Sequence, residues 1–108
     1  MKDKNLSGLM NNTKWNEIRI KMYEYNRNTK WRTIDLNTGH ISEWDSEWFY
    51  HFSVGGFKTI EYLEIHIEND EMKNEIVEIL KKIHVPGEIN NTSIFIYGYK
   101  ENGEINYI

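Results

Sequence analysis

Apolar side chains recur every third or fourth residue in two stretches, which is the spacing of one face of an α-helix. The first stretch covers residues 13–26, with Thr13 as a candidate N-cap, and the second covers residues 70–84. Their apolar positions are Trp15, Ile18, Met22 and Tyr25 in the first stretch, and Met72, Ile76, Ile79, Leu80 and Ile83 in the second. The sequence therefore predicts two amphipathic helices.

Other stretches alternate apolar and polar residues, as β-strands do. The clearest is residues 60–68, where Leu63 and Ile65 point to one face and Glu64 and His66 to the other. Further strands are predicted at residues 31–36, 40–44, 48–54, 93–100 and 104–108. Asn102-Gly103 between the last two is a strong hairpin signal.

This order, α-β-β-β-β-α-β-β, predicts an α+β fold: an antiparallel-rich sheet of about five to six strands with two helices packed on one face. Residues 1–12 are polar and aperiodic, so we expect a flexible N-terminal segment there. The remaining residues, 13–108, are expected to form a single domain.

Charge and composition narrow the possible functions. The 108 residues carry a formal net charge of -4, and the basic residues are scattered, so a nucleic-acid partner is not expected. No apolar run approaches the roughly 20 residues of a membrane-spanning helix, so no membrane partner is expected. The absence of cysteine fits a cytoplasmic protein. The absence of Ala and Gln, with abundant Ile, Asn and Lys, indicates an AT-rich and perhaps bacterial genome.

The segment ISEWDSEWFYHF, residues 41–52, has three interpretations, of which the sequence favours the first, allows the second and gives little support to the third, the mouth of an active site. In the first it is a core strand with a charged turn, whose alternate aromatic residues are buried. In the second it is an exposed recognition surface, because aromatic side chains beside charges are typical of binding hot spots. The residues of that surface would be Trp44, Trp48, Glu43, Asp45 and Glu47.

A second candidate group is Glu64, His66 and Glu68, which share one strand face. Carboxylates and an imidazole can hold a divalent metal or supply a general base. The solvated outer face of a sheet would have the same pattern. No nucleophile motif, phosphate-binding loop or zinc-protease motif occurs, so the sequence predicts no catalytic residue and no cofactor, and favours a protein that is not an enzyme.

The chain resembles a small bacterial family of unknown function. The resemblance lies in the W-D-x-E-W segment at residues 44–48, the I-E-x-L-E-I strand at 60–65, the K-K-I-x-V-P-G helix exit at 81–87 and the I-Y-G-Y strand at 96–99. It covers roughly residues 14–108 and implies no catalytic residue. In size and acidity the chain is also similar to immunity proteins of bacterial toxin systems.

The favoured hypothesis is a non-enzymatic protein-binding module, immunity- or inhibitor-like, whose contact surface includes Trp44. One alternative is a metal-dependent enzyme or metal-binding protein that uses Glu64, His66 and Glu68. Another is a homodimer in which exposed aromatic residues meet across a two-fold axis.

Overall fold

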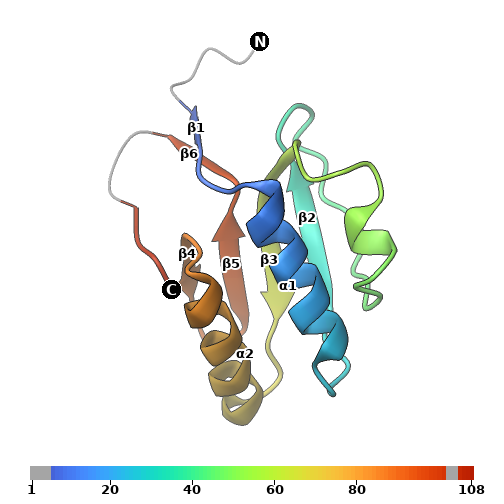
Figure 1. Ribbon diagram of the computed structural model, residues 1–108, viewed down its shortest axis with the longest axis vertical. Coiled ribbons are helices and arrows are strands. Elements are labelled where there is room, and N and C mark those ends of the chain that lie inside the picture. Colours follow the sequence, from blue (N-terminus) through green and yellow to red (C-terminus); the bar gives the residue numbers. More distant parts are fainter. Residues whose placement is uncertain (1–5, 102–104) are drawn as a thin grey trace.

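The computed structural model describes residues 6–101 and 105–108. In these residues, helices α1 (Asn12–Glu24) and α2 (Asp70–Ile83) lie on one face of a four-stranded antiparallel sheet of order β2-β3-β5-β4 (Figure 1). Its strands are β2 (Trp31–Asp35), β3 (Ile60–His66), β4 (Gly87–Ile89) and β5 (Ser93–Tyr97). Strands β1 (Leu6–Gly8) and β6 (Tyr99–Glu101) form a separate two-stranded sheet. The predicted α+β class is confirmed.

Both helices begin at an asparagine that caps them. The Asn11 side chain accepts a hydrogen bond from the Lys14 backbone at 2.8 Å, and Asn69 accepts one from Met72 at 2.8 Å. Each cap satisfies a backbone N–H that has no partner inside the helix. Helix α1 therefore starts before Thr13, the predicted N-cap.

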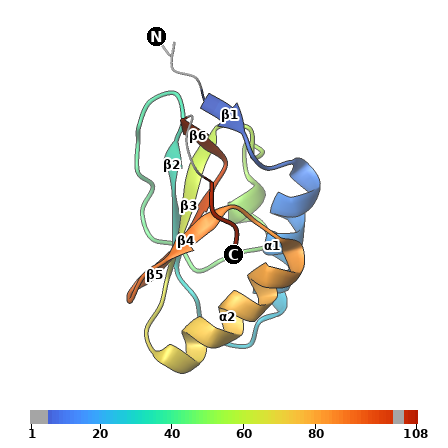
Figure 2. The ribbon, with the colours of Figure 1, turned by 90° about the vertical axis from the view of Figure 1, so that its left-hand side faces the viewer.

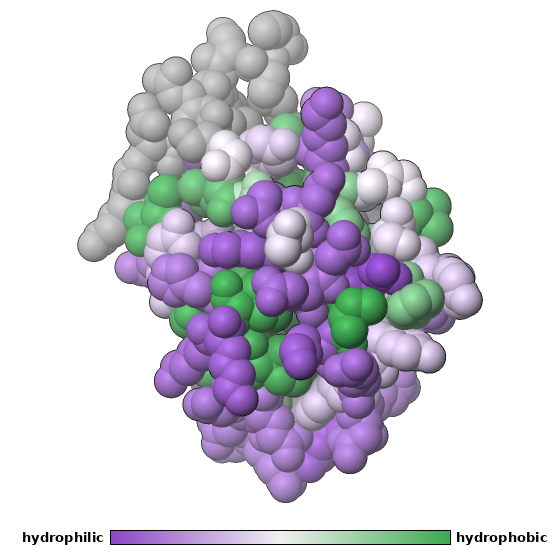
Figure 3. Space-filling view, in the orientation of Figure 1, coloured by the Kyte–Doolittle hydropathy of each residue, from purple (hydrophilic) through white to green (hydrophobic). Residues whose placement is uncertain are grey.

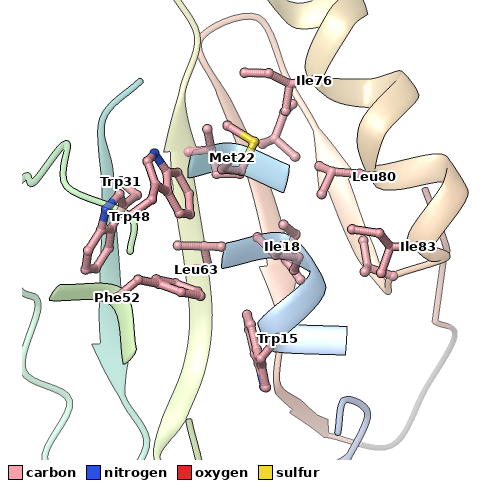
Figure 4. Packing of buried hydrophobic residues seen from close by; sticks show 14 of the residues in the cluster. Trp15, Ile18, Met22, Trp31, Trp48, Phe52, Leu63, Ile76, Leu80 and Ile83 are labelled. Carbon is pink, nitrogen blue, oxygen red and sulfur yellow. The ribbon is translucent and has the colours of Figure 1, made fainter. Parts of the chain in front are cut away.

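The hydrophobic core fills the space between the helices and the sheet (Figure 4). Ile18 of α1 and Leu80 of α2 are fully buried, and so are Leu63 and Ile65 of β3. Burial of each such side chain contributes about 1.5–3 kcal/mol relative to leaving it in water. The apolar stripes that the sequence predicts thus meet the apolar face of the sheet.

Residues 40–44 and 48–54, both predicted as strands, are not strands. Residues 41–45 contact β2 through two isolated bridges, Ile34 with Ile41 and Trp31 with Asp45. Residues His51–Ser53 form a 3-10 helix, η1, because the Glu47 carboxylate accepts hydrogen bonds from three successive backbone N–H groups and closes the preceding turn.

The two ends of the described chain also differ from prediction. Residues 6–8, expected to be flexible, form β1, which pairs antiparallel with β6. The predicted hairpin between 93–100 and 104–108 is wrong in its pairing: β5 pairs with β3 and β4, and Tyr107 bridges to Pro86. The Asn102-Gly103 turn lies outside the described residues.

Gly98 is the reason the long predicted strand 93–100 divides into β5 and β6. A Cβ at this position would collide with the carbonyl oxygen of Ile60. Only glycine permits so close an approach of two backbones.

The helix-covered side of the molecule is mainly hydrophilic, with hydrophobic side chains visible in its middle (Figure 3). Within residues 6–101 and 105–108, no helix has the length and apolar character needed to cross a membrane.

Candidate binding surface on the open face of the sheet

The sheet has one face without helices, because both helices lie on the same side (Figure 2). Leu63 and Ile65 of β3 point into the core, so the alternating residues between and beside them point the other way. The antiparallel register places their cross-strand neighbours on the same face. We call this surface the open face; it comprises Arg32, Ile34, Tyr62, Glu64, His66, Ser93, Phe95 and Tyr97, with Trp44 packed against it.

The centre of the open face is a buried carboxylate that joins three strands. Glu64 is only 9% exposed. Its Oε1 accepts a hydrogen bond from Arg32 Nε at 2.8 Å, and its Oε2 accepts one from Ser93 Oγ at 2.7 Å. A carboxylate can remain buried when it is paired and hydrogen-bonded in this way. Glu64 thereby fixes the position of the Arg32 guanidinium.

Trp44 is held in place by that guanidinium. The Arg32 Cζ atom lies 4.3 Å from the centre of the indole, within the range of a cation–π interaction. The His66 ring meets the same indole edge-on, with ring centroids 5.8 Å apart. Trp44 nevertheless remains 40% exposed. It is therefore a large aromatic side chain that is both fixed and open to solvent.

A small pocket lies beside Trp44. Its volume is about 180 Å³, and it is lined by Lys30, Trp44, His66 and Glu68. The carboxylate of Glu68 forms no hydrogen bond or ion pair with any described residue, and neither does that of Glu43, the residue before Trp44. The surface at and beside the pocket therefore offers carboxylates that are not used inside the described protein.

The other end of the open face is aromatic. The Tyr62 ring packs against Phe95 and Tyr97, with centroid distances of 5.7 and 6.2 Å. Lys100 Nζ lies 4.6 Å from the centre of the Tyr97 ring and 4.0 Å from Glu88. Burial, and then the charge of Glu88, raise the pKa of Tyr97 to about 12, so its phenol stays neutral at physiological pH.

The β2 edge of the four-stranded sheet is covered by residues 41–45, and the β4 edge is covered at Gly87. Along β2, the Ser42 N–H donates to the Thr33 carbonyl oxygen at 2.9 Å, and Ser42 Oγ accepts from the Thr33 N–H at 3.0 Å. Along β4, the Gly87 N–H donates to the Asn106 carbonyl oxygen at 2.9 Å. A partner strand could pair along β2 only by displacing residues 41–45.

The structure separates the five residues that the sequence groups as a contact surface. Trp44 and Glu43 are exposed, whereas Trp48 is 4% exposed and its Nε1 donates to the Thr29 carbonyl oxygen at 3.1 Å. Asp45 and Glu47 have local structural roles. Asp45 Oδ2 lies 2.8 Å from His51 Nδ1, and Glu47 caps the turn before η1.

The pKa of Glu47 reflects this capping. The backbone N–H of His51, followed by those of Tyr50 and Phe49, lowers the pKa of the Glu47 carboxyl below its ordinary value. The charged form of Glu47 is therefore the one that stabilises the turn.

The three predicted metal ligands are not arranged as a metal site. Glu64 is bound to Arg32 and Ser93, while His66 and Glu68 line the pocket beside Trp44. In the part of the chain that the structure describes, no three His, Asp or Glu side chains are grouped so that they could hold a metal ion.

Sequence reasoning missed Arg32 and Ser93 as members of this surface. The sequence did contain a sign of the position of Arg32. Residues alternate between the two faces of a strand, so Arg32 lies on the opposite face from the buried indole of Trp31. Its partner Glu64 is 32 residues away, and only the strand register brings the two together.

A second hollow, of about 350 Å³, lies at the N-terminal end of α1 and includes Trp15, Lys58 and Tyr99 in its lining. The N-terminus of α1 is already capped there by Asn11. At this hollow the helix end already has a hydrogen-bonding partner in Asn11. Beside Trp44, in contrast, the carboxylate of Glu68 has no partner among the described residues.

These features define a small α+β protein whose antiparallel sheet is packed against helices on one face and carries fixed aromatic and charged side chains on the other. The chain belongs to a family of unknown function, DUF6678, whose model matches residues 1–103. The predicted membership of an uncharacterised family is confirmed. Neither a curated protein nor a solved structure matches the chain.

Proposed function

We propose that the protein acts without catalysis, as an immunity- or inhibitor-like module that binds another protein through the open face around Trp44. The observation that carries this proposal is the exposed indole held by Arg32, which is itself held by buried Glu64. A fixed aromatic side chain loses little conformational freedom on binding, and tryptophan is enriched at binding hot spots.

The size of the pocket favours a protein over a small molecule. Pockets for small molecules and cofactors usually measure about 300–1,000 Å³. The pocket beside Trp44 measures about 180 Å³, and the other end of the same open face carries aromatic side chains. A partner that covers this surface and places one side chain in the pocket fits these dimensions better.

Charge favours a basic contact surface on that partner. The chain carries a net charge of -4, and the carboxylates of Glu43 and Glu68 at this site have no described partner, against one such cation, Lys30. Arg32 and Lys100 on the same side are each within 4.0 Å of a carboxylate. Complementary charge would speed association and select the partner, while the covered β2 edge directs it to the face.

The test begins with crosslinking of the tagged protein in a lysate of its source cells, followed by identification and purification of the captured protein. Calorimetry then compares the wild type with Trp44→Ala and Tyr50→Ala. Tyr50 is a matched control because it is an aromatic residue that is 69% exposed and contacts Phe49, away from the open face.

We expect Trp44→Ala to weaken the affinity at least tenfold, or about 1.4 kcal/mol, and Tyr50→Ala to leave it unchanged. Equal affinities of the wild type and Trp44→Ala would overturn the proposal. The proposal would also be overturned, in favour of a homodimer, if the pure wild-type protein sedimented in a concentration-dependent manner and Trp44→Ala abolished that dependence.

A further inference from the structure

The pocket beside Trp44 restricts which side chain of a partner can enter it. This inference rests on the proposed function, since it assigns the group that anchors the partner. Its volume of about 180 Å³ is below the roughly 300–1,000 Å³ of most small-molecule pockets. A pocket of this size suits a single side chain better than a cofactor.

The charges around the pocket favour a charged guest of neither sign. Lys30 and Glu68 in its lining carry opposite charges, and the Arg32 charge is compensated by Glu64 at 2.8 Å. A carboxylate is attracted by Lys30 but repelled by Glu68, and for an ammonium or guanidinium group the reverse holds. A neutral guest meets neither repulsion.

The walls of the pocket favour an aromatic ring. The Trp44 and His66 rings are inclined at 61° to each other, so a third ring can pack edge-on or offset against either. Aliphatic side chains would fill the space but would leave the polar rim without partners.

The two charged lining residues would be matched by a group that both donates and accepts hydrogen bonds. The Lys30 ammonium group only donates, and the ionised Glu68 carboxylate only accepts. A phenolic hydroxyl does both, since it can donate to Glu68 while it accepts from Lys30. We infer that the pocket of Lys30, Trp44, His66 and Glu68 receives a tyrosine side chain of the partner protein.

The inference can be tested before any partner is known. The probes are N-acetyl-tyrosine amide, N-acetyl-phenylalanine amide and N-acetyl-arginine amide, each titrated into ¹⁵N-labelled protein. The readout is the chemical shift of the Trp44 indole N–H and of the Lys30, His66 and Glu68 backbone amides.

We expect the tyrosine probe to shift these signals with an affinity roughly threefold to tenfold higher than that of the phenylalanine probe, because the two differ only by the hydroxyl group. Lys30→Met and Glu68→Leu should each remove most of this difference. Trp44→Ala should abolish binding, and Tyr50→Ala should have no effect.

Equal affinities for the tyrosine and phenylalanine probes, or tighter binding of the arginine probe, would overturn the inference. Its failure is distinguishable from failure of the proposed function. A protein partner lost in Trp44→Ala, without any preference for the tyrosine probe, would leave the proposed function standing and remove only the tyrosine assignment.

Discussion

The two faces of the four-stranded sheet are stabilised in different ways. On the face beneath the helices, Leu63, Ile65 and Ile94 are fully buried among other apolar side chains, and shape and burial determine their packing. On the open face, Glu64 and Tyr62 of the same strand are held by lateral contacts with Arg32 and Phe95. The first face provides stability, while the second arranges polar and aromatic groups at a surface.

Two tryptophans four residues apart show how one segment serves both faces. Trp44 is 40% exposed and contacts Arg32 on the open face, whereas Trp48 is 4% exposed and packs against Trp31 and Phe52 in the core. Between them, Asp45 pairs with Trp31 at the β2 edge, where the segment crosses from one face to the other. Proximity in sequence therefore does not imply a shared role.

The largest expected effect is that of Trp48→Ala. Removal of this buried indole should lower the free energy of unfolding by about 3–5 kcal/mol, because it leaves a cavity beside Trp31 and Phe52. Urea denaturation followed by circular dichroism measures the loss. Trp44→Ala is the matched control and should cost less than about 1 kcal/mol. Similar losses for the two variants would contradict the division between faces.

An intermediate effect is expected on the open face, from Glu64→Ala. This variant leaves Arg32 and Ser93 without their acceptor and should destabilise the fold by about 1–3 kcal/mol. The double variant Arg32→Met/Glu64→Leu should recover much of that loss, since it removes both charges together. Chemical denaturation at pH 7 gives both values, and a double variant no more stable than Glu64→Ala would show that the pair is not the source of the effect.

The smallest effect concerns Glu47, in the segment that links the faces. Hydrogen bonds from backbone N–H groups lower the Glu47 pKa below its ordinary value of 4.5. Its contribution to stability is therefore fully present above that value and is lost as the pH falls through the lowered pKa of the folded state. Glu47→Gln should be less stable than the wild type at pH 7, and the gap should narrow toward pH 3. Denaturation curves at several pH values measure this, and a gap independent of pH would refute the assignment.

Much of the fold could be predicted from the sequence because its periodic segments meet each other in the core. The apolar stripe around Ile18 and the alternation around Leu63 correspond to α1 and β3, both of which are buried. Prediction failed where a side chain, and not periodicity, determines the backbone. Residues 48–54 alternate as a strand would, yet Glu47 closes a turn, so Tyr50 is exposed while Trp48 and Phe52 point inward.

The candidate site was less predictable because it depends on strand register. Trp44 could be identified from its charged surroundings, but the pairing of Arg32 with Glu64 follows only once β2 and β3 are aligned. The same register places Glu64, which was predicted as a metal ligand, where it accepts a hydrogen bond from Arg32 and positions it. The short strand β4 (Gly87–Ile89) was also missed, because Pro86-Gly87 indicates the end of a helix and gives no sign of a strand.

The covered β2 edge of the four-stranded sheet has a consequence for the protein at high concentration. Growth of a fibril by strand addition needs an edge with free N–H and C=O groups. Here the groups of Thr33 are bound to Ser42, and the Gly87 N–H is bound to Asn106. Concentrated solutions of the native protein should therefore resist polymerisation through the β2 edge, and Ser42→Ala, which frees the Thr33 N–H, is the substitution that would open a first site there.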